Sequence, residues 1–132
     1  MAFAFLFPGQ GSQSLNMMDG FADLPVVKQT FDEASAALGE DLWAMLQADS
    51  ADAINATVNT QPLMLAAGVA TYRAWLAQGG VVPAAVAGHS LGEYSALVAA
   101  GSLDFADAIR LVRLRAQAMQ EAVPAGEGAM AA

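Results

Sequence analysis

The sequence contains Gly88-His89-Ser90-Leu91-Gly92, and the fold predicted for the chain follows from this motif and the segments on either side of it. The segment before it, residues 81–87, is short, apolar and rich in valine and alanine, and residues 93–100 are typical of a helix that ends at Gly101. A strand, a glycine-serine-glycine turn and a helix in this order form a nucleophile elbow, which exposes the serine oxygen at the carboxyl end of the strand. Ser90 is therefore the candidate nucleophile. The same pattern also fits an ordinary serine cap of a helix.

The other segments alternate in a way typical of an α/β protein. Residues 2–7 form a continuous apolar run, which predicts a strand buried on both faces of a parallel sheet. The loop at residues 9–13 lacks the third glycine of a dinucleotide fingerprint and the Gly-Lys-Ser/Thr ending of a phosphate loop. Its glycines and glutamines can supply amides to a site, or form a plain turn. Apolar spacing and capping residues predict helices at residues 23–38, from Asp41, after Asp49 or Ser50, at 60–78 and at 102–123. The expected architecture is a parallel sheet with flanking helices.

The helix predicted at residues 60–78 is apolar on nearly all sides, with Arg73 as its one charge. A helix of this kind is buried, so we expect it to run through the middle of the domain. Pro62 is expected in its first turn, where proline is tolerated.

Arg115 does not fit the apolar pattern of the last predicted helix. At 100° per residue it falls near the centre of a broad apolar arc, between Leu111 and Met119. Burying an isolated charge costs many kcal/mol, so Arg115 needs an anion close by. That anion is either a ligand or a carboxylate of the protein, such as Glu93.

Composition excludes several classes of function. The 132 residues are 56% hydrophobic, and a net charge of −8 argues against nucleic-acid binding through a positive field. The absence of cysteine excludes disulfides, thiolate zinc sites and a cysteine nucleophile. Neither a secretory signal nor a membrane span is predicted, so a cytoplasmic location is expected. Arg110 and Arg113 are expected to be solvated charges of a helix face, and with Lys28 they are the candidates for a basic patch that meets an acidic partner.

Three separated motifs, in this order, resemble those of malonyl-CoA:acyl carrier protein transacylases. They are Phe7-Pro8-Gly9-Gln10-Gly11-Ser12-Gln13, Thr60-Gln61-Pro62 and Gly88-His89-Ser90-Leu91-Gly92-Glu93-Tyr94. Leu114-Arg115 and Gly128-Ala129-Met130-Ala131 are similar to the same family, so the resemblance covers essentially the whole chain.

This resemblance implies a role for each candidate residue. Ser90 would accept a malonyl group from malonyl-CoA and pass it to the phosphopantetheine thiol of acyl carrier protein in fatty acid biosynthesis. The backbone amides of Gln10 and Leu91 would form the oxyanion hole, and Arg115 would pair with the free carboxylate of the malonyl group. Gln61 would lie near the active site. Neither a cofactor nor a metal is expected, and malonyl-CoA is the substrate.

The chain departs from the family at the general base. The family uses a histidine well downstream of the elbow, whereas the one histidine here is His89, which is expected to point away from Ser90 as a turn or packing residue. We therefore interpret the chain as an amino-terminal fragment. Residues 1–126 would belong to an α/β-hydrolase-like larger subdomain, and residues 127–132 would begin a ferredoxin-like small subdomain. Such a fragment would leave apolar surface uncovered and be inactive alone.

Two other functions fit parts of the pattern. A serine esterase or thioesterase of the α/β-hydrolase type would share the elbow and give the acyl group to water. A non-catalytic module that binds coenzyme A or acyl carrier protein would need no histidine base.

Overall fold

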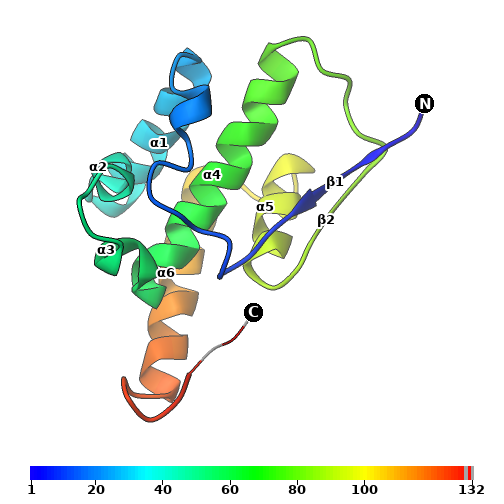
Figure 1. The fold of residues 1–132 in the computed structure, drawn as a ribbon. Helices are drawn as coiled ribbons and strands as arrows, with labels where there is room; N and C mark the ends of the chain where they lie inside the picture. Colours follow the sequence, from blue (N-terminus) through cyan, green and yellow to red (C-terminus); the bar gives the residue numbers. More distant parts are fainter. Residues whose placement is uncertain (130, 132) are drawn as a thin grey trace.

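A computed structural model describes residues 1–129 and 131, in which a short parallel sheet and a set of helices surround one long helix (Figure 1). Met130 of the closing motif and Ala132 lie outside the described residues. In chain order the elements are β1 (Ala4–Phe7), the 3-10 helix η1 (Asp19–Phe21), α1 (Pro25–Leu38), α2 (Leu42–Leu46), α3 (Asp52–Asn55), α4 (Thr57–Ala77), β2 (Ala85–Gly88), α5 (Leu91–Ala99) and α6 (Phe105–Ala122). No helix in the described part of the chain is long and apolar enough to cross a membrane.

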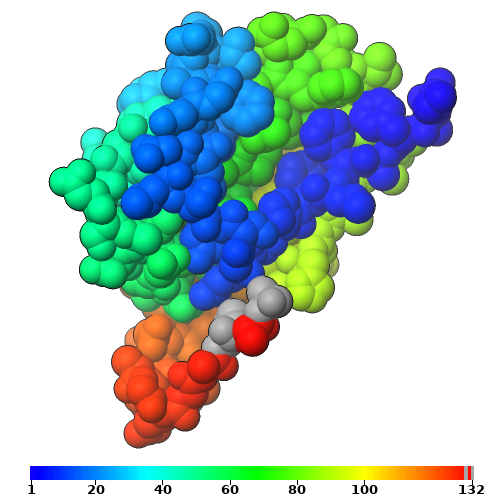
Figure 2. Space-filling model, viewed as in Figure 1, coloured from blue at the N-terminus to red at the C-terminus, as the bar shows by residue number. Residues whose placement is uncertain are grey.

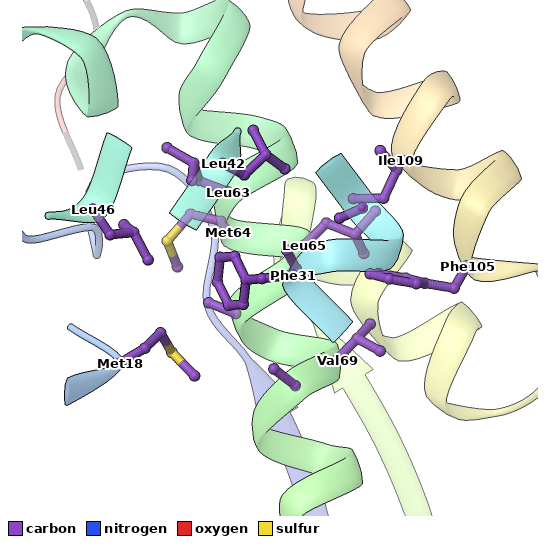
Figure 3. Packing of buried hydrophobic residues seen from close by; sticks show 14 of the residues in the cluster. Met18, Phe31, Leu42, Leu46, Leu63, Met64, Leu65, Val69, Phe105 and Ile109 are labelled. Atoms are coloured by element: carbon purple, nitrogen blue, oxygen red, sulfur yellow. The ribbon is translucent and has the colours of Figure 1, made fainter. Parts of the chain in front are cut away.

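The central helix is α4, and α1, α3, α5 and α6 all pack against it. Its buried residues come from every side of the helix, as the apolar sequence predicted. In the resulting core, Phe31 of α1 gathers with Met64 and Leu65 of α4 and with Phe105 and Ile109 of α6 (Figure 3). This core holds the helices that carry the candidate site in fixed positions.

The start of α4 differs from the prediction. The helix begins at Thr57 rather than at Thr60, so Pro62 lies in the second turn instead of the first. Proline has no N–H to donate to the carbonyl of Val58, and the helix therefore lacks one backbone bond there. At this end of the helix the Thr60 hydroxyl shares its one proton between the carbonyls of Ile54 (2.5 Å from Oγ1) and Ala56 (3.0 Å), which ties the first turn to the end of α3.

The sheet consists of β1 and β2 in parallel, with Ala4 opposite Ala85 and Phe7 opposite Gly88. Its inner face packs on α4, where the rings of Phe5 and Phe7 contact Tyr72 edge-on at centroid distances of 5.4 and 6.3 Å. Because the strands are parallel, their carboxyl ends lie at the same edge of the sheet, next to the start of α5.

The prediction that the first strand is buried on both faces is wrong. Leu6 is 76% exposed, and β1 runs over the surface of the molecule (Figure 2). The second strand begins at Ala85 rather than at residue 81, and Val81 and Val82 are exposed. The physical reason is that, within the described residues, helices α4 and α5 cover the face that carries Phe5 and Phe7, whereas the face that carries Leu6 is exposed.

Helix α6 ends within a residue of the prediction, but a different part of its apolar side faces the core. It packs on α1 and α4, and its buried residues are Phe105, Ala108, Ile109, Val112 and Ala116. Leu111 and Leu114 are 41% and 62% exposed, so the centre of the predicted apolar arc lies outside the core. A helical wheel identifies the apolar side of a helix, whereas the neighbouring elements decide how much of that side is covered.

Arg113 is not the solvated charge that the sequence predicted. Its side chain is only 15% exposed and forms a bidentate ion pair with Glu40, with nitrogen–oxygen distances of 2.6 and 3.1 Å. Nη2 also donates to Oδ1 of Asn59 at 3.3 Å. These contacts join α6 to the turn after α1 and to the start of α4. The hydrogen bonds from Arg113 lower the pKa of the Glu40 carboxyl below its ordinary value, although partial burial acts in the opposite direction.

At neutral pH we expect Glu40→Gln to reduce the free energy of unfolding by less than about 1 kcal/mol, because the carboxylate is partly exposed to solvent. The lowered pKa means that the ion pair stabilises the fold fully above the ordinary value of 4.5 and that this stability is lost as the pH falls through the folded pKa. Urea unfolding of the native polypeptide and the variant across a pH series measures the difference, which should shrink in acid. A difference that stays constant in acid would contradict this account.

Candidate active site

Ser90 lies at the end of β2 and directly before α5, in a strained backbone conformation. Its φ and ψ angles are 54° and −115°, a region that non-glycine residues rarely occupy. The side chain is exposed and makes no capping hydrogen bond to α5, so the interpretation of Ser90 as an ordinary helix cap is wrong. The strand, sharp turn and helix predicted for an elbow are all present.

Two glycines let the strand, the turn and the helix approach one another closely. A methyl group on Gly92 would stand 2.1 Å from the carbonyl oxygen of Phe7, and one on Gly88 would stand 2.0 Å from the backbone of Gly92. Both distances are far shorter than a van der Waals contact. The atoms that would clash belong to the backbone, so they cannot rotate away as a side chain could. The glycines of the motif are therefore required by the close packing of β1, β2 and α5.

The glycine loop after β1 lies against the elbow. A methyl group on Gly9 would stand 2.9 Å from the carbonyl oxygen of His89 and 3.6 Å from the amide nitrogen of Leu91. Among the described residues, the backbone amides of Gln10 and Leu91 donate to no acceptor. One unused amide therefore lies in the glycine loop and the other in the elbow, and the two segments meet at Gly9.

Arg115 reaches from α6 to Ser90. Its Nη2 donates to Ser90 Oγ at 3.1 Å, and its Nη1 donates to Oε1 of Gln61 at 2.7 Å. Gln61 is fully buried in α4, and its Nε2 donates to the sulfur of Met119 at 3.2 Å, which fixes the orientation of the amide. The guanidinium carbon also lies 5.5 Å from the centre of the Tyr94 ring, within the range of a cation–π contact. The structure thus brings together Gln61 of α4, Arg115 of α6 and Ser90, which directly precedes α5.

Arg115 differs from the other cations of the chain in having no carboxylate partner among the described residues. Lys28 pairs with Asp32, Arg73 with Glu33, Arg110 with Asp107 and Arg113 with Glu40. The alternative that Arg115 forms an ion pair with Glu93 is therefore wrong. The basic patch suggested for Lys28, Arg110 and Arg113 is not free either, because each of these charges already has an acidic partner.

His89 is exposed, and no hydrogen bond joins its side chain to Ser90 within the described residues. Its backbone carbonyl accepts from the amide of Gly92 at 2.9 Å, which is the role of a turn residue. The described residues place no histidine or carboxylate in hydrogen-bond contact with the serine.

Three residues contact the site residues in ways that the sequence did not predict: Tyr94, Met119 and Thr57. Tyr94 lies one helical turn after Ser90, Met119 lies one turn after Arg115, and Thr57 lies one turn before Gln61. A spacing of four residues from a candidate site residue within one helix is the signal that would have found them.

Comparisons with known proteins agree on one family. A family model described as the acyl transferase domain matches residues 4–132. The chain is 63% identical over 131 residues to a malonyl CoA-acyl carrier protein transacylase of Escherichia coli strain K12, which covers 98% of this chain and 42% of that protein.

Solved structures give the same result. An acyl-carrier-protein S-malonyltransferase from Burkholderia pseudomallei superposes with a TM-score of 0.91 at 61% identity, covering 94% of this chain and 40% of that one. A malonyl-transacylase in complex with its type II PKS acyl-carrier protein superposes with a TM-score of 0.90 at 58% identity, over 94% of this chain and 40% of that one. The chain therefore spans about two fifths of the length of the relatives that it matches.

Gly92→Ala should destabilise the native polypeptide by about 3 kcal/mol, because the new methyl group meets the backbone of β1 rather than a side chain that can move. Gly20→Ala is the matched control. Nothing lies within 4 Å of a methyl group at Gly20, so its effect should stay within about 0.5 kcal/mol. Denaturant unfolding of both variants measures the two effects, and equal stabilities would show that the close approach at Gly92 is unimportant.

Proposed function

Because this chain belongs to the acyl transferase domain family, we propose that it carries the nucleophile and the acyl-binding groups of a malonyl-CoA:acyl carrier protein transacylase of fatty acid biosynthesis. The observation that carries this proposal is the position of Arg115, which contacts both Ser90 and Gln61 and has no carboxylate partner in the described part of the chain. A cation without a carboxylate partner, beside a nucleophile, suits an acyl group that carries a free carboxylate in addition to its reacting carbonyl.

The proposed reaction has two transfers. Ser90 Oγ loses its proton to a general base and attacks the thioester carbonyl of malonyl-CoA, and the carbon–sulfur bond then breaks to release coenzyme A as the thiol after it takes up a proton. The malonyl ester on Ser90 is next attacked by the phosphopantetheine thiol of acyl carrier protein, which restores the free serine. Strain at Ser90 supports this role, because it keeps Oγ exposed at the start of α5.

Arg115 would recognise the free carboxylate of the malonyl group. Gln61 holds one nitrogen of the guanidinium, and the nitrogen that donates to Ser90 becomes available when the substrate arrives. A planar guanidinium fork matches a carboxylate with two parallel hydrogen bonds, which a lysine would not provide. The transfer of one arginine hydrogen bond from serine to substrate also frees Ser90 Oγ for attack.

The oxyanion of each tetrahedral intermediate would be bound by the amides of Gln10 and Leu91. The supporting observations are that both N–H groups are unused among the described residues and that Gly9 lies against the amide of Leu91. The positive end of the α5 dipole adds to this stabilisation, because Leu91 is the first residue of the helix.

The general base would come from outside the described site, as the family's histidine does. In this proposal residues 1–126 belong to the α/β-hydrolase-like larger subdomain, residues 127–132 begin the ferredoxin-like small one, and the enzyme acts in the cytoplasm. The uncovered face of the sheet at Leu6 and the exposed Leu114 of α6 support the presence of further elements in the complete domain.

The proposal is tested by intact-mass measurement of the native polypeptide after incubation with malonyl-CoA. One malonyl group should be added, Ser90→Ala should abolish the addition, and the group should leave on addition of holo acyl carrier protein. Release of malonate to water without transfer would identify an esterase or thioesterase instead. Binding of coenzyme A without any covalent adduct would identify a non-catalytic module.

Arg115→Ala should lower kcat/KM for malonyl-CoA by about 100-fold, since truncating one partner of a desolvated charge pair costs several kcal/mol. The acetyl-CoA rate, which needs no carboxylate contact, should fall much less. Arg110→Ala is the control, because this exposed arginine of the same helix pairs with Asp107 and with no other carboxylate among the residues described. Initial rates of thiol release with the two substrates measure the effect, and a variant that keeps its preference for malonyl groups would refute the role of Arg115.

A further inference from the structure

The loop that carries Gln10 is fastened to the start of α4 by its side chain. Nε2 of Gln10 donates to Oγ1 of Thr57 at 3.1 Å, across 47 residues of sequence. Next to this bond, Nε2 of Gln13 donates to Oδ1 of Asn55 at 3.0 Å. Both tethers lead to the same short junction between α3 and α4.

This loop needs an external anchor because its own backbone gives little support. Gln10 lies between two glycines, and Gly11 has a φ of 110° that other residues rarely adopt. The one backbone hydrogen bond that closes the loop, from the amide of Ser12 to the carbonyl of Gly9, is long at 3.4 Å. The amide of Gly11 donates to Oε1 of Gln13 at 2.8 Å, so the loop is also joined to Asn55 through Gln13, and the Thr57 contact is the hydrogen bond that the side chain of Gln10 itself makes.

The anchor itself is fixed. Thr57 is the first residue of α4, and the junction before it is held by hydrogen bonds from Thr60 Oγ1 to the carbonyl of Ile54 and from Asn59 Nδ2 to the carbonyl of Ala53 at 3.0 Å. Thr57 and Gln61 are four residues apart and thus share one face of the helix. This face of α4 holds the glycine loop through Thr57 and the guanidinium of Arg115 through Gln61.

We propose that Thr57 is a positioning residue of the oxyanion hole: by accepting a hydrogen bond from the Gln10 side chain, it keeps the backbone amide of Gln10 beside that of Leu91. The inference rests on the function proposed above. Oxyanion donors act only when they are held at hydrogen-bond distance from the developing charge, so a loop that is free to move loses transition-state stabilisation without losing substrate affinity.

The test compares Thr57→Val, which keeps the shape of the side chain and removes the acceptor, with Thr57→Ser, which keeps the hydroxyl. In the native polypeptide, the single-turnover rate of Ser90 malonylation by malonyl-CoA should fall about tenfold in the valine variant, a part of the loss seen when an oxyanion donor is removed. The malonyl-CoA concentration for half-maximal rate should not change, and the serine variant should retain the wild-type rate. Thr71→Val is the control, because the hydroxyl of this threonine in the same helix donates, within the described part of the chain, to the carbonyl of Ala67 alone.

A second substitution removes the same bond from its other end. Gln10→Leu should slow malonylation as much as Thr57→Val, and the double variant should be no slower than the slower single variant. The role of Thr57 would be overturned if the rate losses of the two single variants added in the double variant, or if Thr57→Val left the rate unchanged. It would also be overturned if Thr57→Val changed the half-maximal malonyl-CoA concentration and left the maximal rate unchanged. Malonylation that persists in Ser90→Ala would instead refute the proposed function, so the two failures are distinguishable.

Discussion

The candidate site depends on the close contact of three backbones where β1, β2 and α5 meet. The carbonyl of Phe7 occupies the space that a side chain at Gly92 would fill, and Gly88 is equally close to the first turn of α5. This contact turns the chain sharply at Ser90 and holds the serine in a strained conformation. The energy that maintains the strain comes from elsewhere, because the rings of Phe5 and Phe7 pack on α4 and keep the strands in place.

A second constraint is the pairing of the positively charged side chains with carboxylates. The chain has five Lys and Arg residues, and four of them are neutralised by neighbouring carboxylates. Arg115 is held by an amide oxygen and an aromatic ring, neither of which cancels its charge. A buried glutamine is well suited to this position, since it orients the guanidinium and leaves it able to attract an anion. The same helix face that supports the arginine also supports the glycine loop.

The local features of the fold were predictable from the sequence, and the features set by distant neighbours were not. The elbow, the caps and the bounds of α1 and α6 depend on residues close to one another in sequence, so the motif and the helical spacing were enough. The exposure of one face of β1 and of Leu114 depends on whether another element packs against them, which the local sequence does not reveal. The burial of Arg113 depends on Glu40, 73 residues away. At the site, the sequence indicated that Arg115 needs an anion, but the contacts with Gln61 and Tyr94 required the structure.

The pairing of the surface cations also affects how another macromolecule can approach this chain. With a net charge of −8 and with Lys28, Arg110 and Arg113 each beside a carboxylate, the chain has no net positive charge to attract an acidic macromolecule over a distance. Diffusional encounter through this surface is opposed by long-range repulsion, which dissolved salt screens. An acidic macromolecule would therefore meet these residues more readily as ionic strength rises, the reverse of the behaviour of an electrostatically steered complex.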